Sequence, residues 1–82
     1  MVITYDVLAK LKVALDNNFN QKVRVKFAED VGDCQSVIKV TLEDGFIMET
    51  RLGWYDRMEW SEDHIMLVLL LHFKKMYEDV YK

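Results

Sequence analysis

The chain has 82 residues, of which 51% are hydrophobic and 30% are charged, with a formal net charge of −3. This length predicts one domain over residues 1–82, with enough apolar content for a core. The mild charge argues against a polycation that coats DNA and against a DNA mimic built on massed carboxylates. Cys34 has no second cysteine to pair with, and the N-terminus lacks the pattern of a signal peptide, so we expect a cytoplasmic protein.

The first predicted element is a helix over 4–19. Thr4 is a suitable N-cap. Asn17, Asn18 and Asn20 suit the helix exit, because asparagine tolerates left-handed backbone geometry and competes for backbone hydrogen bonds. The apolar residues that share one face of this helix are Val7, Leu8, Leu11, Ala14, Leu15 and Phe19.

Three strands are predicted, near 22–28, 37–43 and 46–53. Basic residues alternate with valine and phenylalanine over 22–27, which is typical of a half-buried strand. A three-residue turn over 43–45, with Gly45 at positive φ, sets Val40 opposite Met48 and Lys39 opposite Glu49. A two-residue turn would set Val40 opposite Glu49, so the three-residue turn is expected.

The segment 53–60 leaves three alternatives. It prolongs the third strand past a bulge at Gly53, forms a short fourth strand, or is an ordered loop. Trp54 and Trp60 are expected to close one end of the core. Tyr55 and Arg57 are candidate interface residues, because tyrosine and arginine are enriched in binding hot spots.

A second helix is predicted over 61–80, with Ser61 as its N-cap. Its apolar run over 65–71 is too short for a bilayer, which needs about 20 such residues. The stripe expected to face the core comprises Ile65, Leu69, Phe73, Met76 and Val80, flanked by Met66, Leu70 and Tyr77. Leu67, Val68 and Leu71 fall on the far side, where they form a candidate protein interface.

The predicted fold is therefore α+β, in the order α-β-β-β-α, with a three-stranded antiparallel meander and two helices packed on one face. Five cations are expected on the outer sheet face, with Glu49 as its one acid: Lys22, Arg24, Lys26, Lys39 and Arg51. One interpretation is an anion-binding face for nucleic acid or an acidic protein. The other is a solvated face whose lysines protect an edge strand.

The helix-sheet-helix order is similar to that of double-stranded-RNA-binding domains. Those domains place lysines at the start of their second helix to contact phosphates. Glu62 and Asp63 occupy that position here and would repel phosphate, so the resemblance does not imply RNA binding.

The sequence shows no set of residues typical of an enzyme active site, so a non-catalytic protein is expected. The sequence contains no nucleophile motif and no phosphate-binding glycine loop, and Cys34 has no basic neighbour to lower its pKa. His64 and His72 lack a recognised metal-ligand spacing. No metal, cofactor, membrane or small-molecule substrate is expected.

The predicted function is a non-catalytic domain that binds another protein or itself. In size and layout it resembles small accessory proteins of bacteriophages and mobile elements, including inhibitors of host defence systems. The alternative is association with nucleic acid or a ribonucleoprotein through the basic sheet face.

Overall fold

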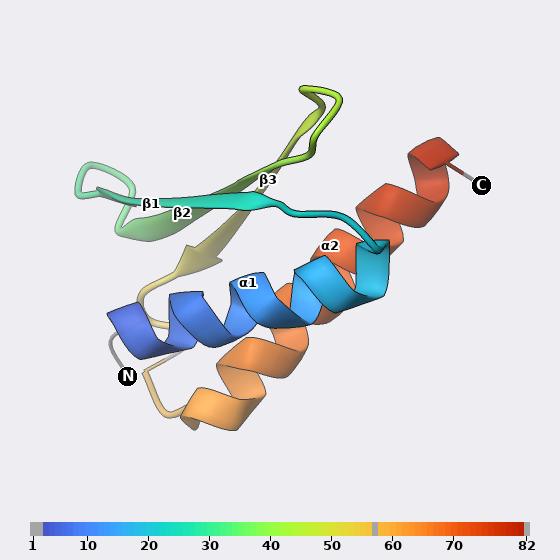
Figure 1. The fold of residues 1–82 in the computed structure, drawn as a ribbon. Helices are drawn as coiled ribbons and strands as arrows, with labels where there is room; N and C mark the ends of the chain where they lie inside the picture. Colours follow the sequence, from blue (N-terminus) through green and yellow to red (C-terminus); the bar gives the residue numbers. More distant parts are fainter. Residues whose placement is uncertain (1–2, 57, 82) are drawn as a thin grey trace.

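The computed structural model describes residues 3–56 and 58–81. Along the chain the elements are α1 (Tyr5–Phe19), β1 (Arg24–Asp30), β2 (Gln35–Thr41), β3 (Ile47–Gly53) and α2 (Glu62–Tyr81). The strands form an antiparallel meander with β2 in the centre, and both helices lie against one face of this sheet (Figure 1). This arrangement confirms the predicted α+β fold and its α-β-β-β-α order.

Helix α1 begins and ends where its capping residues predict. The Thr4 hydroxyl accepts a hydrogen bond from the Val7 amide at 3.3 Å, which satisfies one of the free donors of the first turn. Asn20 adopts left-handed geometry, with φ 53° and ψ 40°, and its amide donates to the carbonyl of Asp16. The helix therefore stops at Phe19 and turns toward β1.

The register of the sheet confirms the three-residue turn. Val40 pairs with Met48 and Lys39 pairs with Glu49, as the alternation of apolar and charged residues predicts. The Leu42 amide donates to the carbonyl of Phe46 at 2.9 Å, and Gly45 has φ +90°. An L side chain at that φ is strained, so a glycine in this turn fixes which face of β3 meets the core.

Strand β1 begins two residues later than predicted and ends later as well. The amides of Lys22 and Val23 bond to the side chains of Glu43 and Asp16, at 2.8 and 2.7 Å, and so do not join the sheet ladder. At its far end β1 continues to Asp30, which pairs with β2. Consequently Lys22 precedes the strand, and Asp30 adds a second acid to a face where only Glu49 was expected.

One core fills the space between the sheet and the helices. The sheet contributes Ile38, Val40, Leu42, Met48 and Leu52, all buried. Helix α1 contributes one residue per turn: Val7, Leu11, Leu15 and Phe19. Helix α2 contributes Ile65, Leu69 and Phe73, none of which is exposed. This spacing of four residues is the apolar stripe that each helix turns toward the sheet.

The two ends of α2 are held differently. Its start is capped as predicted, because the Ser61 hydroxyl accepts a hydrogen bond from the His64 amide at 3.1 Å. At its end Val80 is exposed, contrary to the predicted core stripe. There the helix holds the β2–β3 turn through Tyr81, whose hydroxyl donates to Asp44 and whose ring meets Phe46 edge-on.

The connection from β3 to α2 is an ordered loop over the residues described, 54–56 and 58–61, and no fourth strand forms in them. Trp60 is half-buried against the core, as expected. Trp54 lies on the β1–β2 loop instead, where its amide donates to the Cys34 carbonyl and its indole to Glu29. Neither helix, over the part of the chain described, is both long and apolar enough to cross a membrane.

Candidate binding surfaces

The side of α2 opposite the core carries two exposed leucines. Leu67 is 55% exposed and Leu71 is 53% exposed, one helical turn apart. Leu69 lies between them in sequence and is completely buried, since it points the other way. The exposed pair is called the leucine pair below. Its position confirms that α2 has more apolar surface than the sheet can cover.

Val68 does not join this surface. It is half-buried and packs against the core, although the sequence analysis assigned it to the far side of the helix. Its direction differs by about 100° from that of Leu67. That rotation places it on the same flank of α2 as His72, whose ring nitrogen Nδ1 is 3.1 Å from the Thr50 hydroxyl of β3. This flank of α2 therefore lies against β3, and a helical wheel alone does not show which flank the sheet reaches.

The two other predicted interface residues lie in the β3–α2 loop. Tyr55 is strongly exposed, so its ring is accessible to a partner. Arg57 lies outside the described residues. The loop places Tyr55 after the last strand and before the N-terminus of α2, in the turn that follows Gly53.

Helix α1 also has apolar side chains that the core does not use. Val13 is 59% exposed and lies opposite the buried residue Leu11 on the helix. Ala9 precedes it by one turn and is exposed. A shallow depression of about 490 Å³ runs along this side of α1, between Ala9 and Asn17. Both helices therefore present apolar atoms on the side away from the sheet.

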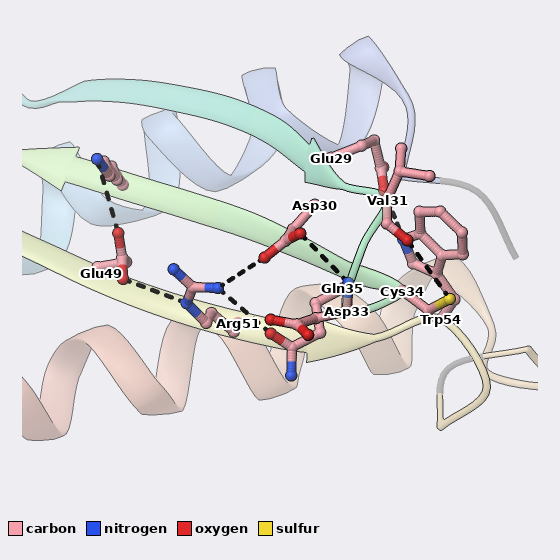
Figure 2. Close-up of polar contacts among 10 residues, drawn as sticks. Glu29, Asp30, Val31, Asp33, Cys34, Gln35, Glu49, Arg51 and Trp54 are labelled. Atoms are coloured by element: carbon pink, nitrogen blue, oxygen red, sulfur yellow. Dashed lines mark hydrogen bonds and ion pairs between the residues drawn. The ribbon is translucent and has the colours of Figure 1, made fainter.

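The outer face of the sheet is less basic than the sequence suggests. Figure 2 shows Arg51 of β3 between two carboxylates: its guanidinium lies 3.2 Å from Asp30 and 3.4 Å from Glu49. Glu49 also pairs with Lys39 at 3.7 Å. Two of the five predicted cations thus have acidic partners. Asp30 supplies one of these pairs, and the later end of β1 brings it onto this face.

The remaining cations lie along the edge strand. Arg24 and Lys26 are exposed at alternate positions of β1, and no ion pair joins either one to a carboxylate of the described residues. Lys26 lies directly opposite Lys39 in the ladder, which places two like charges together. Lys22 continues the row beyond the strand. This row is what remains of the predicted basic face.

Aspartates near the ends of the elements have lowered pKa values. The hydrogen bond from Lys12, at 2.7 Å, is the main cause that lowers the pKa of Asp16, and the amide of Val23 acts in the same direction. The hydroxyl of Tyr81 lowers the pKa of Asp44, and this bond raises the pKa of Tyr81 to about 12. Each carboxylate accepts hydrogen bonds that hold two elements together, so these shifts indicate structural roles.

The histidines and the cysteine of residues 3–56 and 58–81 have separate, local contacts. Nowhere in these two ranges do three or more histidine, cysteine, aspartate or glutamate side chains gather in a way that would hold a metal ion. His64 packs against the Trp60 ring, with centroids 4.5 Å apart, while His72 bonds to Thr50. The thiol of Cys34 bonds to the Val31 carbonyl in the β1–β2 loop.

Sequence reasoning missed the open side of the edge strand. Val25 and Phe27 of β1 point toward the helices, as predicted, yet both are only half-buried. Their partners on β2, Val40 and Ile38, are completely buried. The one available signal was that the apolar stripe of α2 is longer and wider than that of α1. In the structure α1 lies mainly against α2, so the inner side of β1 is only partly covered.

Comparisons with protein-family models, with curated protein sequences and with solved structures gave no match. The function proposed below therefore rests on the surfaces described above.

Proposed function

We propose that this protein is a non-catalytic binding domain whose partner is another protein, and that it docks through the leucine pair of α2. The observation that carries this proposal is the contrast along one helix. Leu69 is completely buried, whereas Leu67 and Leu71 are each more than half exposed on the opposite side. Exposed leucines one turn apart are the pattern by which helices present anchors to a partner.

The charges beside the leucine pair fit the rim of such an interface. Lys75 and Glu78 are exposed on the same side of α2, and Asp63 is exposed one turn before Leu67. Interfaces of this kind have an apolar centre and a polar rim, and the rim charges set the orientation of the partner and the rate of association. Both signs of charge are present beside the leucine pair. The arrangement of these charges, and not their sum, would therefore determine which partner binds.

The leucine pair alone is too small to hold a stable complex. Complete burial of one leucine contributes about 1.5–3 kcal/mol, and roughly half of each side chain is already covered, which leaves about 1.5–3 kcal/mol for the pair. A micromolar complex needs about 8 kcal/mol. The partner must therefore contact more surface, and Val13 of α1 offers further exposed apolar area.

The test compares two substitutions of the same residue type on the same helix. Leu71→Glu should leave the fold intact, because the site is exposed, and should abolish association by placing an uncompensated charge in a desolvated contact. Leu69→Glu should unfold the domain, because it buries that charge in the core. Circular dichroism melting reports folding, and sedimentation together with affinity capture reports association with a second copy or with another protein.

Two outcomes would contradict the proposal. If Leu71→Glu unfolds the domain as Leu69→Glu does, the leucine pair belongs to the core. If Leu71→Glu is folded and binds every partner as the wild type does, docking uses another surface. Ile47→Glu is a useful control, since it adds the same charge at an exposed apolar residue of the outer sheet face.

A second candidate function, nucleic-acid binding through the outer sheet face, has less support. Arg51 and Lys39 are already paired with carboxylates, and no aromatic ring lies on this face to stack on bases. What favours it is the row of cations on β1. Nucleic-acid binding through this face predicts an affinity for single-stranded or duplex oligonucleotides that weakens steeply with salt and is lost in Arg24→Glu. The absence of any salt-dependent shift would exclude it.

A further inference from the structure

Strand β1 is an edge strand with a groove beside it. In the described chain β1 pairs with β2 alone, so its other edge has no strand neighbour. A groove of about 590 Å³ lies between this edge and α1. Its lining is mostly apolar and comes from Tyr5, Leu8, Ala9, Lys12, Val23, Arg24, Val25 and Phe27. None of these residues belongs to α2, so the groove is separate from the leucine pair.

The groove exists because α1 lies closer to α2 than to β1. Phe19 of α1 stacks on Tyr77 of α2, with ring centroids 4.2 Å apart, and Lys10 pairs with Glu62. This leaves Val25 and Phe27 half-covered on the inner side of the edge strand. Tyr5 is at the N-terminal end of α1 and is 88% exposed, so its ring is available at one wall of the groove.

The other side of the same edge carries charge. Side chains of a strand alternate between the two faces of the sheet, so Arg24 and Lys26 point outward where Val25 and Phe27 point toward the groove. Neither cation forms an ion pair with a described carboxylate, and Lys26 lies opposite Lys39. A carboxylate placed beside these cations would relieve the repulsion between the lysines.

We infer that the open edge of β1 binds an extended peptide segment of another protein, in which apolar residues alternate with aspartate or glutamate. The peptide adds a fourth strand to the sheet by main-chain hydrogen bonds, which is a known mode of peptide recognition. Its apolar side chains enter the groove between α1 and β1. Its acidic side chains lie on the outer face, within about 4.5–5.5 Å of the facing β1 residues at the Cβ atoms, and pair with Arg24 and Lys26.

The alternation of cationic and apolar side chains along β1 favours an acidic peptide over a second copy of the chain. A second β1 would bring the same two cations to the shared edge, and lysines on edge strands are a known protection against such pairing. The far end of β1 limits the docked stretch, because Asp30 is held by Arg51 and would repel an acidic peptide. The peptide therefore faces the part of the strand from Arg24 to Phe27.

The experiment measures the anisotropy of a short fluorescein-labelled peptide in which valine alternates with glutamate. Two matched probes carry glutamine in place of glutamate, or N-methyl groups on the backbone amides that would face β1. The wild-type protein should bind the first peptide, and each of the matched probes should bind at least about tenfold more weakly. The double variant Arg24→Glu, Lys26→Glu should bind the first peptide about tenfold or more weakly, and Tyr5→Ala should also weaken it.

Two variants keep this inference separate from the proposed function. Leu71→Glu should bind the peptide as the wild type does, because it lies outside the groove. Val13→Ala, an exposed apolar residue of α1 outside the groove, should also bind normally. All variants are exposed-site changes, and unchanged melting temperatures would confirm that each protein is folded.

Several results would overturn the inference. Failure of the wild type to bind the valine–glutamate peptide, or equal binding of the N-methylated probe, excludes strand addition. If a single-stranded oligonucleotide binds and the double variant abolishes that binding while no peptide binds, the cations serve nucleic acid. If the wild type sediments as a dimer and the double variant as a monomer, the edge is occupied by a second copy.

Discussion

Asp16 joins helix α1 to the start of β1. Replacing it by alanine should destabilise the fold more than substitution of a surface residue usually does. One carboxylate oxygen accepts the Val23 amide and the other accepts the Lys12 ammonium, both at 2.7 Å. Val23 is only 2% exposed, so without Asp16 its amide loses its acceptor at a part-buried position. An unsatisfied buried donor costs about 1–3 kcal/mol. For a domain of this size, about 2 kcal/mol lowers the melting temperature by about 8–16 °C.

The assay is thermal unfolding followed by circular dichroism, with two matched controls. Lys12→Ala removes only the helical ion pair, and such pairs contribute about 0.3–0.5 kcal/mol. Asp16→Asn removes the charge but keeps a carbonyl oxygen that can accept a hydrogen bond from the Val23 amide. Its decrease in melting temperature should therefore lie between those of Lys12→Ala and Asp16→Ala. If Asp16→Ala melts no lower than Lys12→Ala, the bond to Val23 contributes little and the reasoning is wrong.

The same carboxylate predicts a dependence on pH. The folded state lowers the pKa of Asp16 from its ordinary value of 3.8, mainly through the hydrogen bond from Lys12. Its stabilising effect is therefore complete above that value and is lost as the pH falls through the folded-state pKa. The gap in melting temperature between the wild type and Asp16→Ala should be constant near neutral pH and should narrow in acid below pH 3.8. A gap that widens in acid would contradict this assignment.

Three further predictions address the turn, the C-terminus and the core. Gly45→Ala should destabilise the domain by about 1–2 kcal/mol in denaturant unfolding, because Gly45 has φ +90° and nothing crowds the position, so backbone strain is the only cost. The hydrogen bond to Asp44 raises the pKa of Tyr81 to about 12, so Tyr81→Phe should remove the step near pH 12 from the ultraviolet phenolate titration, and Asp44→Asn should move that step toward pH 10. The stabilising effect of the Tyr81–Asp44 bond is present below pH 10 and is lost as the pH rises toward 12. Leu69→Ala should cost about 2–5 kcal/mol, while Leu71→Ala should change stability by less than about 0.5 kcal/mol; equal costs would refute the assignment of their two sides.

The element order and the sheet register were predictable because the capping and turn residues indicate the same arrangement as the pattern of apolar residues. Thr4 marks the start of α1 through its side-chain hydroxyl, and Asn20 marks its end through left-handed backbone geometry. The turn at Gly45 admits one register that places Val40 opposite Met48 and keeps charges on the other face. Signals of this kind act within a few residues, and a sequence displays them directly.

The errors came from contacts between distant segments. The start of β1 is set by the carboxylate of Asp16, which captures the Val23 amide, and no local pattern reveals this bond. The position of Val68 depends on where the edge of β3 lies beneath α2. The groove beside β1 likewise depends on how closely α1 approaches α2. Periodicity identifies the inward side of an element but does not show how much of that side is covered.

The charge on the outer sheet face illustrates the same limit. Counting cations on alternate positions correctly identified Arg24, Lys26, Lys39 and Arg51 as neighbours on one face. The sequence did not reveal that Asp30 pairs with Arg51, because Asp30 was expected in the loop and not in the strand. A shift of two residues at the end of a strand was enough to convert a basic face into a row of cations along one edge.

The most direct test of the central claim is photo-crosslinking from two sites of equal exposure. A benzophenone side chain is placed at Leu67, which is 55% exposed on α2, or at Ile47, which is 58% exposed on the outer sheet face. Both proteins are irradiated under the same conditions in an extract of the source cells. The proposal predicts protein adducts from position 67 that Leu71→Glu abolishes, and none from position 47. Adducts from position 47 alone, or adducts at position 67 that persist in Leu71→Glu, would contradict it.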